Sequence, residues 1–404
     1  MTKRIIFFVL IFLYVYVTTF NIFLTEIIKV PAPILILTPL LIFYRQDNVN
    51  FRYGLQGILF FIAVMLNMLI GESELVGFFA FIINLACLII FFNYIIGDSL
   101  ERMMMTIYFF YGLLFISGVV LLMDHQLDIA DIRTMLIGGP VLQSPSGIAT
   151  TQFTFGYQMA AVTPFMLIGT ILFKKNWLLS LVIIILAICF IFFGMQRSVF
   201  VAFFAAVALF IFLYYRAKSI FLFLGISAIF LLGQGYMDQF SEDKNQKNIL
   251  NKSVKQADKN ENRGDLISEN FKIIAEYPFG LIFYNKTWND VVQHNFVYKN
   301  GHQIITSHNA YLMFITYLGP ILGLLLLVLI YFKVCKNVWL ALKQIKLEEN
   351  AMLVCLSCSF IAVSINSFFH NEWLLSTSGP TQFLYFSILH LTLIKSNKTK
   401  NITY

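Results

Sequence analysis

Long apolar stretches separated by short polar segments run along most of the chain, and they predict a helical membrane protein. A helix needs roughly 20 apolar residues to cross about 30 Å of hydrocarbon. The predicted fold class is therefore all-α, a polytopic membrane helix bundle of about 12 transmembrane helices. The predicted spans are residues 5–24, 28–44, 54–71, 75–97, 103–123, 153–173, 177–195, 198–215, 219–236, 309–332, 350–370 and 376–394.

One large polar segment divides the chain into three parts. Residues 1–236 hold the first nine predicted helices, residues 237–308 form an extracytoplasmic loop, and residues 309–404 hold helices 10 to 12 and a short cytoplasmic tail. The loop begins with a stretch rich in Lys, Asn, Asp and Gln, at 241–262, which we expect to be mobile. An amphipathic helix should follow and end at Pro278, either on the outer membrane interface or capping the bundle. Its apolar positions are Leu266, Ile267, Phe271, Ile273, Ile274 and Tyr277.

Lysine and arginine in the short loops predict the orientation, because cytoplasmic loops of membrane proteins carry an excess of both. With a cytoplasmic N-terminus, the short outer loops hold only Lys29, Arg133 and Arg197. We therefore expect both termini in the cytoplasm and the 237–308 loop outside. The N-terminal apolar run lacks a small-x-small cleavage site and is read as a retained helix. The cytoplasmic side would hold Lys3, Arg4, Arg45, Arg52, Arg102, Lys174, Lys175, Arg216, Lys218, Lys333, Lys336, Lys343, Lys346, Lys395, Lys398 and Lys400.

Composition agrees with a membrane protein and argues against other classes. Of the 404 residues, 59% are hydrophobic and 12% are charged, with a mean hydropathy of +0.79, whereas a soluble domain carries about 25% charged residues. The net charge of +7 lies in short loops, so it does not indicate a nucleic-acid partner. Cys355 and Cys358 fall in a predicted span, where thiols usually pack. The outer loops carry no carboxylate cluster at ligand spacing, so we expect chemistry without metal or cofactor.

His308 lies where a polar segment turns into an apolar run, in Ser307-His308-Asn309-Ala310-Tyr311. A histidine at such a boundary touches both protein and water, and an ordinary pKa of about 6.5 lets it act as a base near neutral pH. The plainer interpretation is a capping or interfacial histidine. Asn309, beside it, is expected to orient the ring or a substrate hydroxyl, and Tyr311 is a further candidate site residue.

The pattern His308-Asn309-x-Tyr311-Leu312, followed by Gly319, resembles the signature of bacterial O-antigen ligases and O-antigen polymerases. In this chain Pro320 follows that glycine, and the second glycine of the signature falls one place late, at position 323.

Two upstream elements extend the resemblance, which covers about residues 190–330. Arg197 lies in Gly-Met-Gln-Arg-Ser, with Met-Gln in place of the usual small residues. Arg263 opens the predicted amphipathic helix, which ends in Pro278-Phe-Gly280, and Ile282 replaces the family's second glycine there.

The resemblance implies a helical membrane glycosyltransferase in the bacterial inner membrane that uses a lipid-linked sugar and inverts the anomeric carbon. Its donor would be an undecaprenyl-diphosphate-linked glycan, its acceptor a glycan or lipid A core, and a chain-length regulator a further partner. Arg197 and Arg263 suit the diphosphate, because guanidinium groups bind phosphate bidentately and stay charged. His308 would take the proton from the acceptor hydroxyl. His370 and Glu372, in the last outer loop, are secondary candidates.

Three functions stay open at this point. A polymerase joins lipid-linked repeat units, and the divergent positions before Arg197 and at Ile282 favour such a substrate-tailored enzyme. A ligase uses the same donor and differs only in the acceptor. A glycolipid transporter should carry ionisable groups near the bilayer midplane, and the predicted spans hold hardly any.

Overall fold

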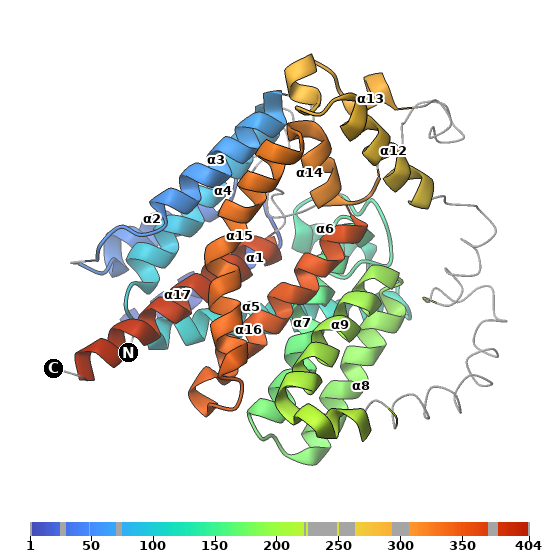
Figure 1. Ribbon diagram of the computed structural model, residues 1–404. Coiled ribbons are helices and arrows are strands. Elements are labelled where there is room, and N and C mark those ends of the chain that lie inside the picture. The colour runs from blue at the N-terminus through green and yellow to red at the C-terminus, as the bar shows by residue number, and fades with distance from the viewer. Residues whose placement is uncertain are drawn as a thin grey trace. The chain divides into compact units, whose positions relative to one another are not determined.

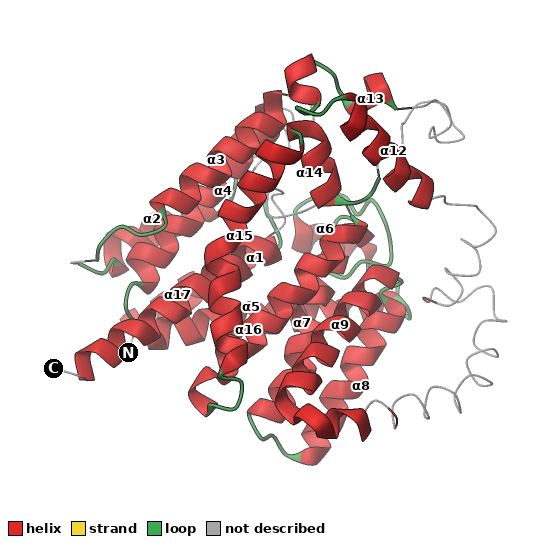
Figure 2. Cartoon of the chain, viewed as in Figure 1, coloured by secondary structure: helices red, strands yellow, loops and turns green. Residues whose placement is uncertain are grey.

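The computed structural model describes residues 2–24, 30–47, 49–69, 75–221, 224, 249, 263–292, 307–370 and 379–402. Their regular structure is helical, apart from one isolated bridge between Phe23 and Pro31 (Figure 2). Among these residues, seven helices are long and apolar enough to cross a membrane, and three shorter apolar helices accompany them. The all-α, multi-pass class is therefore confirmed, whereas a count of about 12 spans is not. Most of the predicted span 219–236, and the stretch 241–262 apart from residue 249, lie outside the described residues.

The chain forms two compact units. The first comprises residues 1–113, 262–337 and 367–404. Its elements are α1 (Thr2–Thr19), α2 (Pro33–Tyr44), α3 (Gly54–Leu69), α4 (Leu75–Ile90), the π-helical η1 (Phe91–Ile96), α12 (Arg263–Glu276), η3 (Leu281–Tyr284), α13 (Trp288–Val291), α14 (Ala310–Leu318), η6 (Ser367–Phe369), α17 (Gly379–Ile402), and the first parts of α5 (Leu100–Asp124) and α15 (Pro320–Lys343) (Figure 1).

Aromatic packing and one buried histidine hold α17 within the first unit. Phe383 of α17 stacks on Phe110 of α5 with ring centroids 4.2 Å apart. The buried His390 places Nε2 2.7 Å from the carbonyl oxygen of Gly97 and Nδ1 2.7 Å from the hydroxyl of Tyr53. Because a carbonyl only accepts, Nε2 carries the proton and Tyr53 donates to Nδ1. This histidine thus ties α17 to the segments before α3 and after η1.

The second unit comprises residues 114–261 and 338–366. It holds the ends of α5 and α15 together with α6 (Ala130–Ile137), α7 (Gln152–Leu172), α8 (Trp177–Phe193), α9 (Arg197–Tyr215), η2 (Arg216–Lys218), η5 (Glu348–Asn350) and α16 (Ala351–Asn366).

Small side chains let the helices of the second unit pack closely. α7 packs against α8, α9 and α16, and α16 also packs against α9. Ala202 and Ala206 of α9 meet Ala362 of α16 in one buried cluster, and Ser359 of α16 donates a 2.7 Å hydrogen bond to the carbonyl of Ala161 in α7. Small residues at such crossings allow helix backbones to approach, which is how membrane helices usually associate.

The predicted span 309–332 is not one helix. α14 ends at Leu318, Gly319 has φ +77°, and α15 begins at Pro320. Proline lacks a backbone N–H and glycine tolerates positive φ, so this pair ends one helix and starts the next. The membrane-length helix is therefore α15, Pro320–Lys343, and α14 is a separate short helix in front of it.

Candidate functional site

His308 lies two residues before the start of α14, and its backbone is unusual. Its φ is +51°, in the left-handed region, and its side chain is half-buried. Non-glycine residues adopt this region rarely, and such strain concentrates at functional sites. Asn309 is the N-cap of α14, since its side-chain oxygen accepts from the N–H of Leu312 at 3.0 Å. That oxygen thus fixes the start of the helix that His308 precedes.

His370 lies beside this helix start. Its carbonyl oxygen accepts from the N–H of Ala310 at 2.9 Å, and its side chain is buried. Tyr311 places its hydroxyl 3.0 Å from that of Tyr331 and its ring against Phe368, with centroids 4.7 Å apart. Glu372 lies outside the described residues. The structure therefore groups His370 and Tyr311 around the entry to α14.

The amphipathic helix is confirmed as α12, but its buried face differs from the predicted one. Leu266 and Ile273 are buried, whereas Ile267 and Phe271 are exposed. The fully buried Asn270 takes their place: its Oδ1 accepts from the hydroxyl of Thr316 at 2.7 Å. A polar pair thus lies inside the contact between α12 and α14, where an apolar pattern cannot reveal it.

Apolar side chains complete the packing of α12 on α14. Leu266 and Ile273 form one buried cluster with Leu281, Trp288, Val292, Met313 and Tyr317. A capping box between Thr287 and Asp290 starts α13, the helix that carries Trp288. The backbone N–H of Thr287 donates to the Asp290 carboxylate at 2.7 Å, which lowers the pKa of that carboxyl from its ordinary value.

The two helices run parallel. Gly280, which follows α12, lies against Gly319, which follows α14. Asn270 in the middle of α12 bonds Thr316 of α14. The first residues of α12 and α14 therefore lie at the same end of the pair (Figure 1). Arg263 is the first residue of α12, and its side chain lies outside the described part of the structure.

Arg197 opens α9 in the second unit, and its side chain is exposed. The preceding Gln196 is buried, faces Gly156 of α7 and is the N-cap residue. Arg197 and Arg263 thus both begin helices, whose N-termini carry positive partial charge and favour anions. Because Arg197 belongs to a different unit from His308, a site containing all three residues is a proposal.

Sequence reasoning missed one polar centre altogether. Arg133 was counted as an outer-loop charge, but its guanidinium is buried. It donates to Asp124 at 2.7 Å, to Ser144 at 3.1 Å and to the carbonyl of Gly147 at 2.9 Å, and it also bonds Ser146. The only hint in the sequence is a pair of opposite charges beside a turn-rich stretch. Asp128 and Asp131, in the same segment, are exposed.

Among the described residues, no three His, Cys, Asp or Glu side chains lie close enough together to hold a metal. Cys355 and Cys358 are buried free thiols.

The helices and their composition define a multi-pass membrane protein of the all-α class. In a comparison with protein families, residues 181–328 match the family described as O-antigen ligase. The resemblance seen in the motifs is thereby confirmed for this part of the chain, which contains Arg197, Arg263, His308 and Asn309. The match supports a membrane enzyme of the O-antigen ligase or polymerase type. No curated protein matches the chain.

Proposed function

We propose that the protein is a metal-independent, inverting glycosyltransferase of the bacterial inner membrane. It takes an undecaprenyl-diphosphate-linked oligosaccharide as donor and joins such repeat units into a longer glycan on the outer face of the membrane. The observation that carries the proposal is the parallel packing of α12 and α14, which places the N-terminal residue Arg263 and the strained His308 at the same end of one helix pair.

An anionic leaving group suits this end of the pair. Two helix N-termini contribute positive partial charge there, which favours phosphate. Arg263 adds a guanidinium with the fork geometry that binds phosphate oxygens in pairs. We assign Arg197, at the start of α9, to the same diphosphate from the second unit.

A buried hydroxyl next to His308 also supports a bound substrate. The side chain of Ser307 is buried, and its hydroxyl has no hydrogen-bond partner among the described residues. Buried polar groups are nearly always hydrogen-bonded, so a sugar hydroxyl is a suitable partner.

The proposed reaction assigns one role to each group. The neutral imidazole of His308 takes the proton of an acceptor hydroxyl as that oxygen attacks the anomeric carbon from the face opposite the diphosphate. The anomeric C–O bond breaks, and the bonding electrons leave with the diphosphate. Arg197 and Arg263 stabilise the charge that develops on the departing oxygen. Asn309, Tyr311, His370 and Glu372 are proposed to position the sugars.

A ligase is the second candidate, because the matched family is described as O-antigen ligase. It uses the same donor and transfers the glycan to lipid A core or another acceptor. Analysis of the lipid-linked glycans that accumulate when the gene is deleted separates the two. Single unpolymerised repeats support a polymerase, and long chains left on the carrier support a ligase. No change in lipid-linked glycan contradicts both.

A further inference from the structure

A cavity of about 630 Å³ lies within the second unit, where α9 and α15 end. Its walls are the end of α9 with η2 and the turn that follows α15, residues 342–347. Its volume falls within the roughly 300–1,000 Å³ of small-molecule sites. The proposed donor site does not include it, since Arg197 begins α9 and Arg216 follows its last residue. Those 19 residues of helix span about 28 Å.

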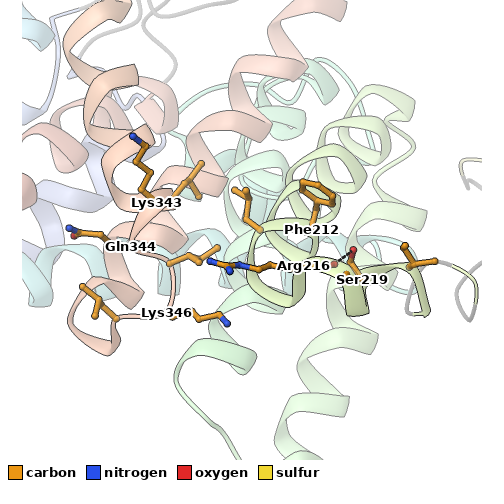
Figure 3. A pocket seen from close by; sticks show the side chains of 12 residues that line it. Phe212, Arg216, Ser219, Lys343, Gln344 and Lys346 are labelled. Atoms are coloured by element: carbon orange, nitrogen blue, oxygen red, sulfur yellow. Dashed lines mark hydrogen bonds between the residues drawn. The ribbon is translucent and has the colours of Figure 1, made fainter.

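The charged groups in this cavity are all basic. The lining includes Arg216, Lys343 and Lys346 and no acidic residue. Figure 3 shows the ends of Arg216 and Lys346 pointing toward the same space, whereas Lys343 extends away from it. Lys343 places its ammonium over the ring of Trp339, 5.3 Å from the centroid. Arg216 and Lys346 are therefore the cations that an occupant would meet.

Nearby acids do not cancel this charge. Glu348 follows the lining segment and forms an ion pair with Lys174. The hydrogen bond to Glu348 raises the pKa of Lys174 from its ordinary value. Glu349 does not line the cavity either, and Lys218 adds a further positive charge in η2.

The remaining walls are mostly apolar. Phe212, Leu213 and Ile220 come from α9 and the segment after it, and Leu342, Ile345 and Leu347 from the other side. An occupant should therefore carry an anionic head and an apolar body. The cavity also lies where two apolar helices give way to lysine and arginine, which is the level of lipid head groups.

We propose that this cavity binds an anionic phospholipid of the cytoplasmic leaflet. The phosphate lies between Arg216 and Lys346, where the guanidinium binds two of its oxygens. The start of the acyl chains lies against Phe212, Leu213 and Ile220. The lipid thereby holds the end of α9 to the turn after α15.

The test uses the full-length protein, purified in detergent and stripped of lipid. Its melting midpoint is followed while phosphatidylglycerol, phosphatidylcholine or inorganic phosphate is added. Phosphatidylglycerol should raise the midpoint by several degrees and the other two should not. The double variant Arg216→Gln/Lys346→Gln should lose at least about tenfold in apparent affinity, the scale for two cations at a charged membrane surface.

Two controls make the result specific. The variant Lys175→Gln/Lys336→Gln also removes two exposed positive charges, outside the cavity, and should respond like the wild type. The double variant Arg216→Lys/Lys346→Arg keeps both charges, so phosphatidylglycerol should still raise its melting midpoint. This result would show that the glutamine variant fails through loss of charge and not through misfolding. An equal response of both glutamine variants, or an equal effect of phosphatidylcholine, would overturn the lipid site. An effect of inorganic phosphate alone would replace the lipid by a soluble phosphate.

Discussion

The backbones of Gly280 and Gly319 approach each other closely. A Cβ atom on Gly280 would come within 2.1 Å of the backbone nitrogen of Gly319, and one on Gly319 within 2.4 Å of the carbonyl carbon of Phe279. Both glycines have positive φ, +94° and +77°. The contact joins the segment after α12 to the break between α14 and α15. It gives a physical reason for a glycine in each of these two motifs.

Alanine at either glycine should destabilise the protein. Positive φ and the backbone clash together cost at least about 2 kcal/mol for each of Gly280→Ala and Gly319→Ala. The melting midpoint of purified protein measures the effect. Gly264→Ala is the control, because its Cβ would meet nothing within 4 Å and α12 continues through it. Equal midpoints for Gly280→Ala and Gly264→Ala would contradict the close approach.

Thr316→Val should weaken the contact between α12 and α14. The substitution leaves the buried Oδ1 of Asn270 without its 2.7 Å donor, a loss of about 1–3 kcal/mol. Thr392→Val is a matched control, because the hydroxyl of Thr392 bonds the carbonyl of Ile388 in its own helix. A midpoint for Thr316→Val as high as that of the control would mean that the buried pair contributes little.

His308 should be tested with two substitutions, because its backbone lies in the left-handed region. Asparagine tolerates that region and alanine does not, so His308→Asn removes the base with less strain. Both should cut transfer by about a hundredfold or more, the scale of a lost general base.

Reconstituted transfer with purified lipid-linked donor measures this effect, with His125→Ala as the control in a different segment. Transfer by the wild-type protein should slow as the pH is lowered, because His308 must be neutral to act as a base. Addition of a chelator should leave the rate unchanged. A near-normal rate for His308→Asn would remove the residue from the mechanism. Loss with the chelator alone would point to a metal.

The two arginines should act through the donor's diphosphate. Arg197→Lys keeps the charge but loses the paired geometry, so turnover should fall while expression stays normal. Arg263→Ala should weaken donor binding as well as turnover. Binding of lipid-linked donor and glycan length in cells are the two measurements, with Arg45→Lys as the control for an arginine elsewhere. Normal glycan length in both variants would separate these arginines from the diphosphate.

Arg133→Met should damage folding. The substitution leaves the Asp124 carboxylate, 8% exposed, without the guanidinium that lies 2.7 Å away, and breaking such a buried pair costs about 3–5 kcal/mol. Asp131→Asn, an exposed change in the same helix, is the control. Yield and melting midpoint measure the difference, and similar values for both variants would show that the pair is dispensable.

The sequence predicts the helices well, because membrane-length apolar runs and a helical period are properties of local segments. It places the end of α12 within two residues of the observed end at Glu276. It does not predict that His370 lies beside the start of α14, because that contact joins segments far apart in the sequence. It misses the break before Pro320, since an apolar run continues across it. It also misses the pairs Asn270–Thr316 and Arg133–Asp124, because such partners are recognisable only once the chain has folded.

Helix α9 carries an arginine at its start and another just after its end, with neither glycine nor proline between them. Its 19 residues make a stiff rod of about 28 Å, close to the roughly 30 Å hydrocarbon layer of a typical bilayer. In a thicker membrane the mismatch with this rod would cost a fraction of a kcal/mol per Å. The length of α9 therefore favours a membrane whose hydrocarbon layer is about 28 Å thick, whichever acceptor the protein uses.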